Sequence, residues 1–252
     1  MSITDQTQDI LYRVEDGIAY VTLNRPQKAN ALNEGMLDAI IEACEEAREN
    51  DEIKAIVLAA NGRIFSGGVD LKVFDPSQST TVQTDHYLLV WDRMIDAMRS
   101  LPKPVICAIQ GPAIAGGLSM SLACDIRIAS EEASFVYPRV PQGHLPGEFN
   151  LKRLVEVIGP SRTRLVLFGA RTVSATEAYE WGLVDCLASQ KTLADEIDGF
   201  VQNVSNTPTP LVVATHQLIH KPNSSEIRRL AEDAVEKRDS AALPNLMSKN
   251  TQ

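Results

Sequence analysis

FSGGVDL at residues 65–71 and GPAIAGG at residues 111–117 are the two stretches that decide how this sequence is interpreted. Each is a glycine-rich turn that follows a strand-like apolar run, at residues 56–58 and 105–109. Glycine lets the backbone turn sharply and come close to a ligand. Residues 118–123 are typical of a helix start, where free N–H groups favour an anion. Two such turns facing one another would form an oxyanion hole. The alternative is two ordinary strand-to-helix turns, and the surrounding sequence has to decide.

The composition narrows the class of protein. The chain has 252 residues and a mass of 27.6 kDa, which suits one large domain or one domain with an appendage. A net charge of −9 and a pI of about 5.0 argue against a nucleic-acid partner. Residues 1–8 lack the pattern of a signal peptide, and no apolar run of about 18 residues occurs, so we expect a cytoplasmic protein without a membrane span. The four cysteines are widely spaced, so we expect reduced thiols and no metal site.

Strand and helix patterns alternate along the chain, which predicts an α/β fold. A hairpin is expected around Asp16-Gly17, and Asn33 can cap a helix. Further strands are predicted at 53–59, 105–109, 126–129 and 135–136, and further helices at 86–98, 151–158, 174–181 and 193–237, the last broken at its prolines. Residues 75–84 and 138–147 are predicted to be loops, and no strand is predicted beyond Leu187.

Six stretches, taken in order, resemble the crotonase (enoyl-CoA hydratase/isomerase) superfamily. They are residues 24–32, 64–71, 103–111, 115–117, 124–129 and 178–184. The resemblance implies a twisted ββα superhelix, or spiral, over residues 1–190 that contains the active site. It also implies a helical C-terminal trimerisation region over residues 191–252. Family members are homotrimers or dimers of trimers that bind acyl-CoA thioesters, so coenzyme A enters as part of the substrate and no separate cofactor is expected.

The resemblance also assigns roles to residues. The two donors of an oxyanion hole fall on the backbone N–H groups of Val69 and Gly116. Backbone contacts to the adenine of CoA fall on Lys28, Ala29 and Ala31. The other turn residues expected to line the substrate site are Gly68, Asp70, Leu71 and Gly117. Asp70 is expected to hold the turn rather than to react.

Two positions depart from the family pattern. Hydratases use two glutamates as acid and base, but Ser119 stands at the first position and Arg139, in Tyr137-Pro138-Arg139, stands at the second. Neither side chain can replace a carboxylate near neutral pH, so hydration by the usual pair is not expected. Ser119 is interpreted as a small residue beside a helix start that lines the substrate site. Arg139 could bind an anionic acyl group or form a surface ion pair.

His144 and Glu148 are the candidate acid and base in place of the glutamates. They lie four residues apart in the Pro/Gly-rich loop where other family members carry a catalytic aspartate. A neutral histidine can accept a proton near pH 7, and a carboxylate can orient it. The alternatives are a loop histidine bonded to backbone or water, and a glutamate in the first turn of the following helix.

The sequence therefore predicts a crotonase-family enzyme that acts on an acyl-CoA and stabilises an enolate or oxyanion. The alternatives are a C–C bond hydrolase of the β-diketone type, a thioester hydrolase, or a non-catalytic CoA-binding subunit. Lys237 and Arg238 resemble the family's contacts to the 3′-phosphate of CoA, although the Pro-x-Phe that usually follows is absent.

Overall fold

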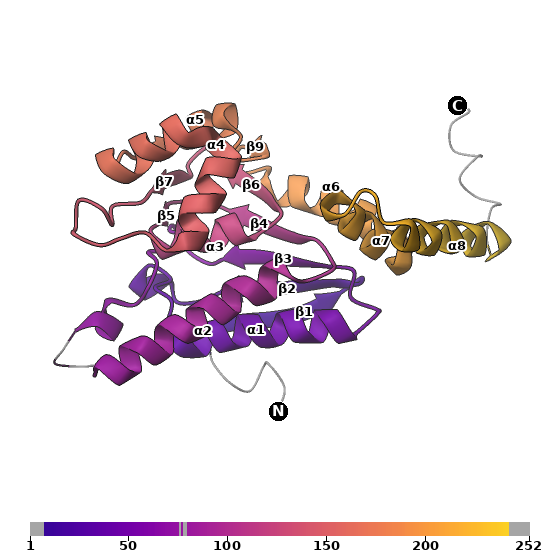
Figure 1. Cartoon of the computed structure of the whole chain (residues 1–252), viewed down its shortest axis with the longest axis horizontal. Helices are drawn as coiled ribbons and strands as arrows, with labels where there is room; N and C mark the ends of the chain where they lie inside the picture. Colours follow the sequence, from indigo (N-terminus) through magenta and orange to yellow (C-terminus); the bar gives the residue numbers. More distant parts are fainter. Residues whose placement is uncertain (1–7, 76, 78–79, 242–252) are drawn as a thin grey trace.

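A six-stranded sheet forms the centre of the molecule in a computed structural model, which describes residues 8–75, 77 and 80–241 (Figure 1). The strand order is β1-β2-β3-β4-β6-β9; β1 and β2 are antiparallel and the remaining neighbours are parallel. The strands are β1 Ile10–Glu15, β2 Ile18–Leu23, β3 Ala55–Ala60, β4 Val105–Ile109, β6 Ile126–Ser130 and β9 Cys186–Ala188. A second, three-stranded sheet has the order β5-β7-β8, with β5 Ala113–Ile114, β7 Ser134–Val136 and β8 Val173–Ser174.

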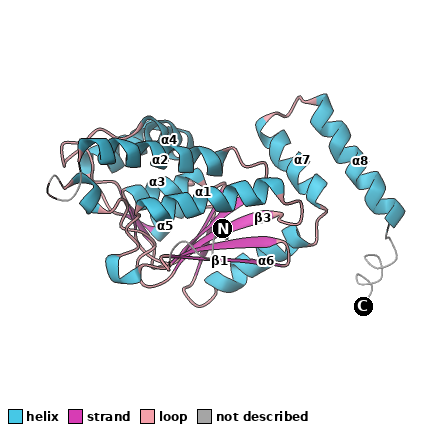
Figure 2. Cartoon of the chain, turned by 90° about the horizontal axis from the view of Figure 1, so that it is seen from below, coloured by secondary structure: helices cyan, strands magenta, loops and turns pink. Residues whose placement is uncertain are grey.

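Helices lie on both faces of the larger sheet, and two further helices project from it. In chain order the helices are α1 Glu34–Glu49, α2 Thr81–Arg99, α3 Gly116–Ala123, α4 Glu148–Gly169, α5 Ala175–Trp181, α6 Leu193–Ser205, α7 Thr209–His220 and α8 Ser225–Ala241. Figure 2 shows α1 on one side of the sheet and α6 on the other. Alternate residues of β3 divide between the two cores: Ile56 and Leu58 pack with the α1 side, and Val57 packs with the α6 side. This two-sided burial explains why the central strands are continuous apolar runs.

Several local predictions are confirmed. The hairpin pairs Ile10 with Leu23 through Glu15 with Ile18. The Asn33 side chain caps α1 by accepting a hydrogen bond from the Met36 N–H, and a capping box at Ser174 opens α5. The C-terminal region is helical and breaks near its prolines, because Pro208 precedes α7 and Pro222 lies between α7 and α8.

Two boundaries predicted from the sequence are wrong. The predicted loop 75–84 ends earlier, because a capping box between Thr80 and Gln83 starts α2 at Thr81. Residues 76, 78 and 79 lie outside the described residues. Strand β9 extends to Ala188 and pairs with β6, although no strand was predicted beyond Leu187. Three residues are too few to show a periodic pattern, so the pairing partner determines this strand.

The helices α7 and α8 pack against one another and project from the sheet (Figures 1 and 2). Trimerisation through residues 191–252 stays a prediction, and residues 242–252 lie outside the described part of the chain. Over the described residues, no helix combines the length and the apolar character needed to cross a membrane.

Candidate active site

The two glycine turns meet side by side. Ser66 and Ala113 form a parallel bridge, and the Ile114 N–H donates to the Ser66 carbonyl at 2.9 Å. Gly68 has a φ of +93°, and a Cβ atom placed there would lie 2.7 Å from the Gly116 nitrogen. A Cβ atom on Gly116 would lie 3.1 Å from the Val69 nitrogen. Only glycine allows the two backbones to approach this closely.

The N–H groups of Val69 and Gly116 lie on these facing turns. Within residues 8–75, 77 and 80–241, neither donates a hydrogen bond, whereas their neighbours Gly68 and Asp70 both do. Gly116 is also the first residue of α3, whose eight residues are all buried. A helix N-terminus carries partial positive charge, and its first N–H groups have no partner in the helix. The geometry therefore leaves two backbone donors free beside one another.

Trp91 forms a wall beside this position. Its Cη2 atom would lie 2.9 Å from a Cβ atom on Gly116, and its ring stacks on Tyr87 at 6.4 Å between centroids. The Tyr87 hydroxyl donates to the Leu32 carbonyl at 2.9 Å, which fixes the ring pair. The sequence predicted α2 but gave no signal that this tryptophan reaches the second glycine turn.

The loop with Lys28, Ala29 and Ala31 is attached directly to the first glycine turn. The Gly67 N–H donates to the Ala29 carbonyl at 2.8 Å, and the Leu32 N–H donates to the Gly68 carbonyl at 2.7 Å. Ala29 and its neighbour Asn30 both have left-handed φ values, of 52° and 50°. The predicted CoA loop and the predicted oxyanion turn are therefore one rigid unit.

Asn30 is the residue that fixes the shape of this loop. Its side chain is fully buried, donates to the carbonyls of Asn61 and Ile64, and accepts from the Arg25 N–H. These three bonds satisfy the amide and compensate for its burial. Asn30 lies within a stretch that resembles the family pattern, but the sequence gave no signal of this role.

Asp70 holds the first turn. Its carboxylate accepts from Arg25 at 2.6 Å and from the Lys72 N–H at 3.2 Å, which caps the short 3₁₀ helix Leu71–Phe74. Arg25 also donates to the Ala31 carbonyl at 3.0 Å and lies 3.4 Å from Asp9. Burial raises the pKa of Asp70, but the bonds from Arg25 and Lys72 outweigh it and hold the pKa below its usual value. Leu71 itself is exposed.

Ser119 lies next to Ala115, one turn into α3. Its hydroxyl donates to the Ala115 carbonyl at 3.1 Å, and it lies close enough to the Tyr137 hydroxyl to lower the pKa of that tyrosine. Both side chains are buried. Burial raises the pKa of Tyr137, and the bond to Ser119 and the charge of Arg139 oppose that effect only in part. Arg139 is half-buried. The Ala115 N–H donates to the Val136 carbonyl at 2.9 Å, so the end of β7 lies close to the start of α3.

His144 and Glu148 do not form a pair. Both are exposed, and among the described residues no hydrogen bond joins their side chains. Glu148 is the first residue of α4 and forms an ion pair with Lys152, so the alternative placement in the first helical turn is confirmed. The Lys152 ammonium lowers the pKa of Glu148. The loop carrying His144 extends from the body before α4 (Figure 1).

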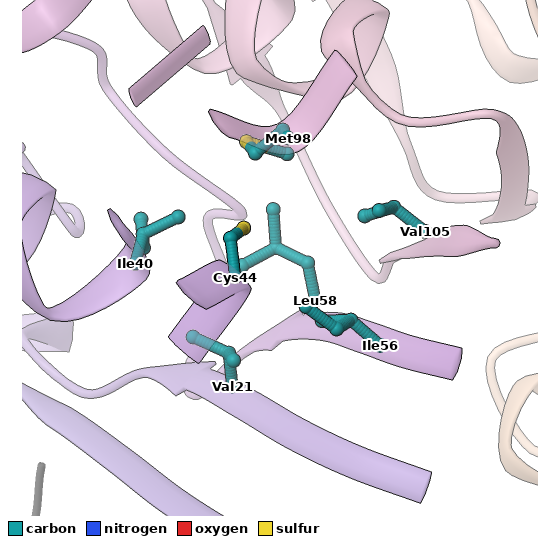
Figure 3. A pocket seen from close by; sticks show the side chains of 7 residues that line it. All are labelled: Val21, Ile40, Cys44, Ile56, Leu58, Met98 and Val105. Atoms are coloured by element: carbon teal, nitrogen blue, oxygen red, sulfur yellow. The ribbon is translucent and has the colours of Figure 1, made fainter. Parts of the chain in front are cut away.

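The cavity in Figure 3 is not a substrate site. It holds about 10 Å³ and lies within the core, lined by Val21, Ile40, Cys44, Ile56, Leu58, Met98 and Val105. That volume is at the lower limit for one water molecule, and the apolar lining offers water no partners. Burial raises the pKa of the Cys44 thiol to about 12, so the sulfur behaves as a small apolar group. We interpret the cavity as a packing gap. Among the described residues, no cluster of three potential metal ligands occurs.

Comparison with known proteins yields consistent matches. A model of the enoyl-CoA hydratase/isomerase family matches residues 13–240. The 4-chlorobenzoyl coenzyme A dehalogenase-2 of an Arthrobacter species is 30% identical over 223 residues, which are 88% of this chain and 81% of that protein. The 1,2-epoxyphenylacetyl-CoA isomerase of Escherichia coli is 31% identical over 79% of this chain and 77% of that protein.

Solved structures give the same result for the fold. The crystal structure of an enoyl-CoA hydratase from Mycobacterium smegmatis superposes with a TM-score of 0.79 at 28% identity, covering 92% of this chain and 91% of that one. An enoyl-CoA hydratase from Bacillus anthracis superposes with a TM-score of 0.80 at 26% identity, over 91% and 90% of the two chains. The architecture expected from the resemblance, a crotonase-like α/β core, is confirmed.

Proposed function

This chain is an enzyme of the enoyl-CoA hydratase/isomerase family, and we propose that it stabilises negative charge on the carbonyl oxygen of an acyl-CoA thioester. The observation that carries the proposal is the pair of unpartnered N–H groups at Val69 and Gly116 on two touching glycine turns. A thioester carbonyl that becomes an enolate or a tetrahedral oxyanion gains charge in the transition state. Fixed backbone donors stabilise that charge without reorganising.

We propose that the CoA part of the substrate lies along the loop with Lys28, Ala29 and Ala31. The bonds between this loop and the first glycine turn support the proposal, because they would fix bound CoA relative to the N–H groups of Val69 and Gly116. Lys237 and Arg238, on α8, stay candidates for the 3′-phosphate. Coenzyme A is then part of the substrate, and no separate cofactor is needed. Gly68, Gly117 and Trp91 are proposed to line the space around the thioester.

We propose that His144, rather than a pair with Glu148, moves the proton. Glu148 is engaged by Lys152, and a lowered pKa makes a carboxylate a weaker base. Arg139 is proposed to contact the acyl group, and Ser119 is proposed to line the site with its hydroxyl bonded to the Ala115 carbonyl. Neither is proposed to transfer protons. Relatives named as a hydratase, an isomerase and a dehalogenase share this fold, so the oxyanion donors are compatible with several reactions. Hydration by a glutamate pair is not proposed here, because positions 119 and 139 carry serine and arginine.

We also propose a homotrimer or dimer of trimers in the cytoplasm. The supporting observation is the apolar surface of α4, where Leu151, Val155, Leu165 and Phe168 are exposed on the single chain. Exposed apolar patches on a protein surface often mark sites where another subunit binds.

The test compares two ligands that differ only in the carbonyl. Calorimetric titration should show that acetyl-CoA binds more tightly than S-ethyl-CoA, a thioether that lacks the carbonyl oxygen. Turnover is then measured on a panel of enoyl-CoA, aryl-CoA and β-diketone substrates, and we expect activity on at least one thioester. Equal affinity for the two ligands and no turnover across the panel would contradict the proposal. Activity on the β-diketones alone would instead favour C–C bond hydrolysis.

A further inference from the structure

Ala115, directly before Gly116, has a strained backbone. Its φ is 48° and its ψ is −107°, a conformation that L-residues with a Cβ atom rarely adopt. Strain of this kind persists only where the surrounding structure enforces it. The residue is an alanine and not a glycine, so the bonds around it have to hold this conformation.

Hydrogen bonds hold Ala115 from both sides. Its N–H donates to the Val136 carbonyl at 2.9 Å. Its carbonyl accepts two bonds from Ser119, one from the backbone N–H at 3.0 Å and one from the hydroxyl at 3.1 Å. The first is the ordinary helical bond, whereas the second exists only because residue 119 carries a hydroxyl.

The Ala115 carbonyl and the Gly116 N–H belong to the same peptide plane. A planar trans peptide directs its C=O and N–H in opposite directions, so a bond that fixes one also fixes the other. The described chain contains no cis peptide. The Ser119 hydroxyl therefore adds a side-chain bond to the helical bond that fixes where the Gly116 N–H points.

Tyr137 stands behind Ser119. The Ser119 hydroxyl gives its proton to the Ala115 carbonyl, and it lies close enough to the Tyr137 hydroxyl to lower the pKa of that tyrosine. Ser119 is 1% exposed and Tyr137 is 5% exposed, so water does not compete for the bond to Ala115. The bond from Ser119 to the strained peptide is therefore buried, with Tyr137 beside it.

We infer that Ser119, supported by Tyr137, is a positioning residue that orients the Gly116 N–H toward the substrate carbonyl. This inference rests on the proposed function, because it assigns a role to one of the two proposed oxyanion donors. It gives the serine at the position of a family glutamate a task of its own: it transfers no proton and instead fixes a donor.

The test measures hydrogen bonding at the carbonyl directly. Acetyl-CoA labelled with ¹³C at the carbonyl is bound to the enzyme, and the C=O stretching frequency is compared with that in water by difference infrared spectroscopy. In the wild-type enzyme the stretch is expected to move to lower frequency. In Ser119→Ala at least half of that shift should disappear, while the affinity for free CoA should change by less than about threefold, since CoA itself does not contact the hole. Turnover should fall by about 10- to 100-fold in kcat with little change in KM.

Ser121→Ala is the matched control. Ser121 is also a buried serine on α3, but its hydroxyl donates to the Leu118 carbonyl at 2.8 Å, away from Ala115. Its removal should leave the carbonyl shift unchanged. Ser119→Thr keeps the hydroxyl and should restore most of the shift. Tyr137→Phe should give a partial loss, and it serves as the second variant if Ser119→Ala folds poorly.

The outcomes separate the two ideas. A wild-type enzyme that binds acetyl-CoA without a carbonyl shift would overturn the proposed oxyanion hole, and with it this inference. A wild-type shift that survives unchanged in Ser119→Ala and Tyr137→Phe would overturn only the inference. Ala115→Gly adds a further check, because glycine adopts this conformation without strain. Replacing Ser119 should therefore lower turnover less in the Ala115→Gly enzyme than in the enzyme with Ala115.

Discussion

The glycine-turn frame and the proline loop differ in how they are held. The glycine-turn frame comprises residues 65–71, residues 111–117 and the attached loop 28–31. It is tied by backbone bonds at 2.7–3.3 Å and by the side chains of Asn30 and Arg25. The proline loop comprises residues 138–147, and most of it is exposed. The bonds described within it are those of the Gly143 and His144 N–H groups to the Val140 and Arg139 carbonyls.

This contrast shows how the two tasks of the proposed chemistry are divided. Stabilisation of charge needs donors that do not move, and backbone within a buried frame provides them. Proton transfer needs a side chain of suitable chemistry, which a single substitution can supply or remove. A frame that is fixed by its own chain can therefore be retained while the residues that transfer protons change.

The largest effect is expected from closing the gap between the turns. Gly68→Ala would place a Cβ atom 2.7 Å from the Gly116 nitrogen and 2.9 Å from the Ile114 carbonyl, and neither backbone atom can move away cheaply. We expect kcat to fall by about 10²–10³-fold, the usual effect of losing an oxyanion donor. Steady-state kinetics on the best substrate of the acyl-CoA panel would measure it.

Gly143→Ala is the control from the proline loop. Gly143 also has a positive φ, of +82°, but no atom lies within 4 Å of an added Cβ. Both variants therefore introduce the same backbone strain, of about 1 kcal/mol. Only Gly68→Ala also blocks the hole. Equal losses of activity in the two variants would show that strain, and not the closed gap, is responsible.

The next effect concerns the proline loop itself. His144→Ala is expected to lower kcat by about 10²-fold, the lower range for loss of a general acid or base. Glu148→Gln should leave kcat within about twofold, since Lys152 already occupies that carboxylate. Measuring kcat of both variants on the same substrate shows whether His144 acts without Glu148. A larger loss in Glu148→Gln would restore the pair that the sequence predicted.

Local signals made the frame and much of the fold predictable. Glycine marks tight turns by its chemistry, and Asn33 and Ser174 mark helix starts, so these features could be derived from neighbouring residues alone. Strand β9 could not, because it depends on pairing with β6 across the fold. The Arg25–Asp70 pair joins residues 45 positions apart, and no spacing rule finds it.

The parts of the site that the sequence missed depend on tertiary structure. Ala115 carries no sequence signal for a left-handed backbone, since alanine is a good helix former. Trp91 looks like an ordinary core residue of α2 until the fold brings it to Gly116. Conversely, the spacing of His144 and Glu148 suggested a pair, but α4 begins at Glu148 and directs it to Lys152.

A smaller effect is expected from the charges that hold the frame. Asp70→Asn keeps an acceptor for the Lys72 N–H but removes the charge that faces Arg25, whose side chain is 9% exposed. We expect the free energy of unfolding to fall by about 2 kcal/mol, the usual contribution of a hydrogen bond to a charged group. Urea unfolding at pH 7 would measure it. Lys152→Gln, which breaks the exposed pair at the end of the proline loop, should leave the urea midpoint unchanged.

The smallest effect is the pH dependence of this stabilisation. The pKa of Asp70 lies below its usual 3.8 in the folded enzyme, so the folded state binds this proton less readily than the unfolded state does. The stabilisation is therefore fully present above about pH 4 and is lost as the pH falls through the folded-state pKa. Urea midpoints of the wild type and Asp70→Asn should differ at pH 7 and converge as the pH falls through the folded-state pKa of Asp70. Lys152→Gln should follow the wild type over the same range, because its partner Glu148 is exposed. A constant difference between wild type and Asp70→Asn across this range would show that Asp70 holds the frame through its shape and not through its charge.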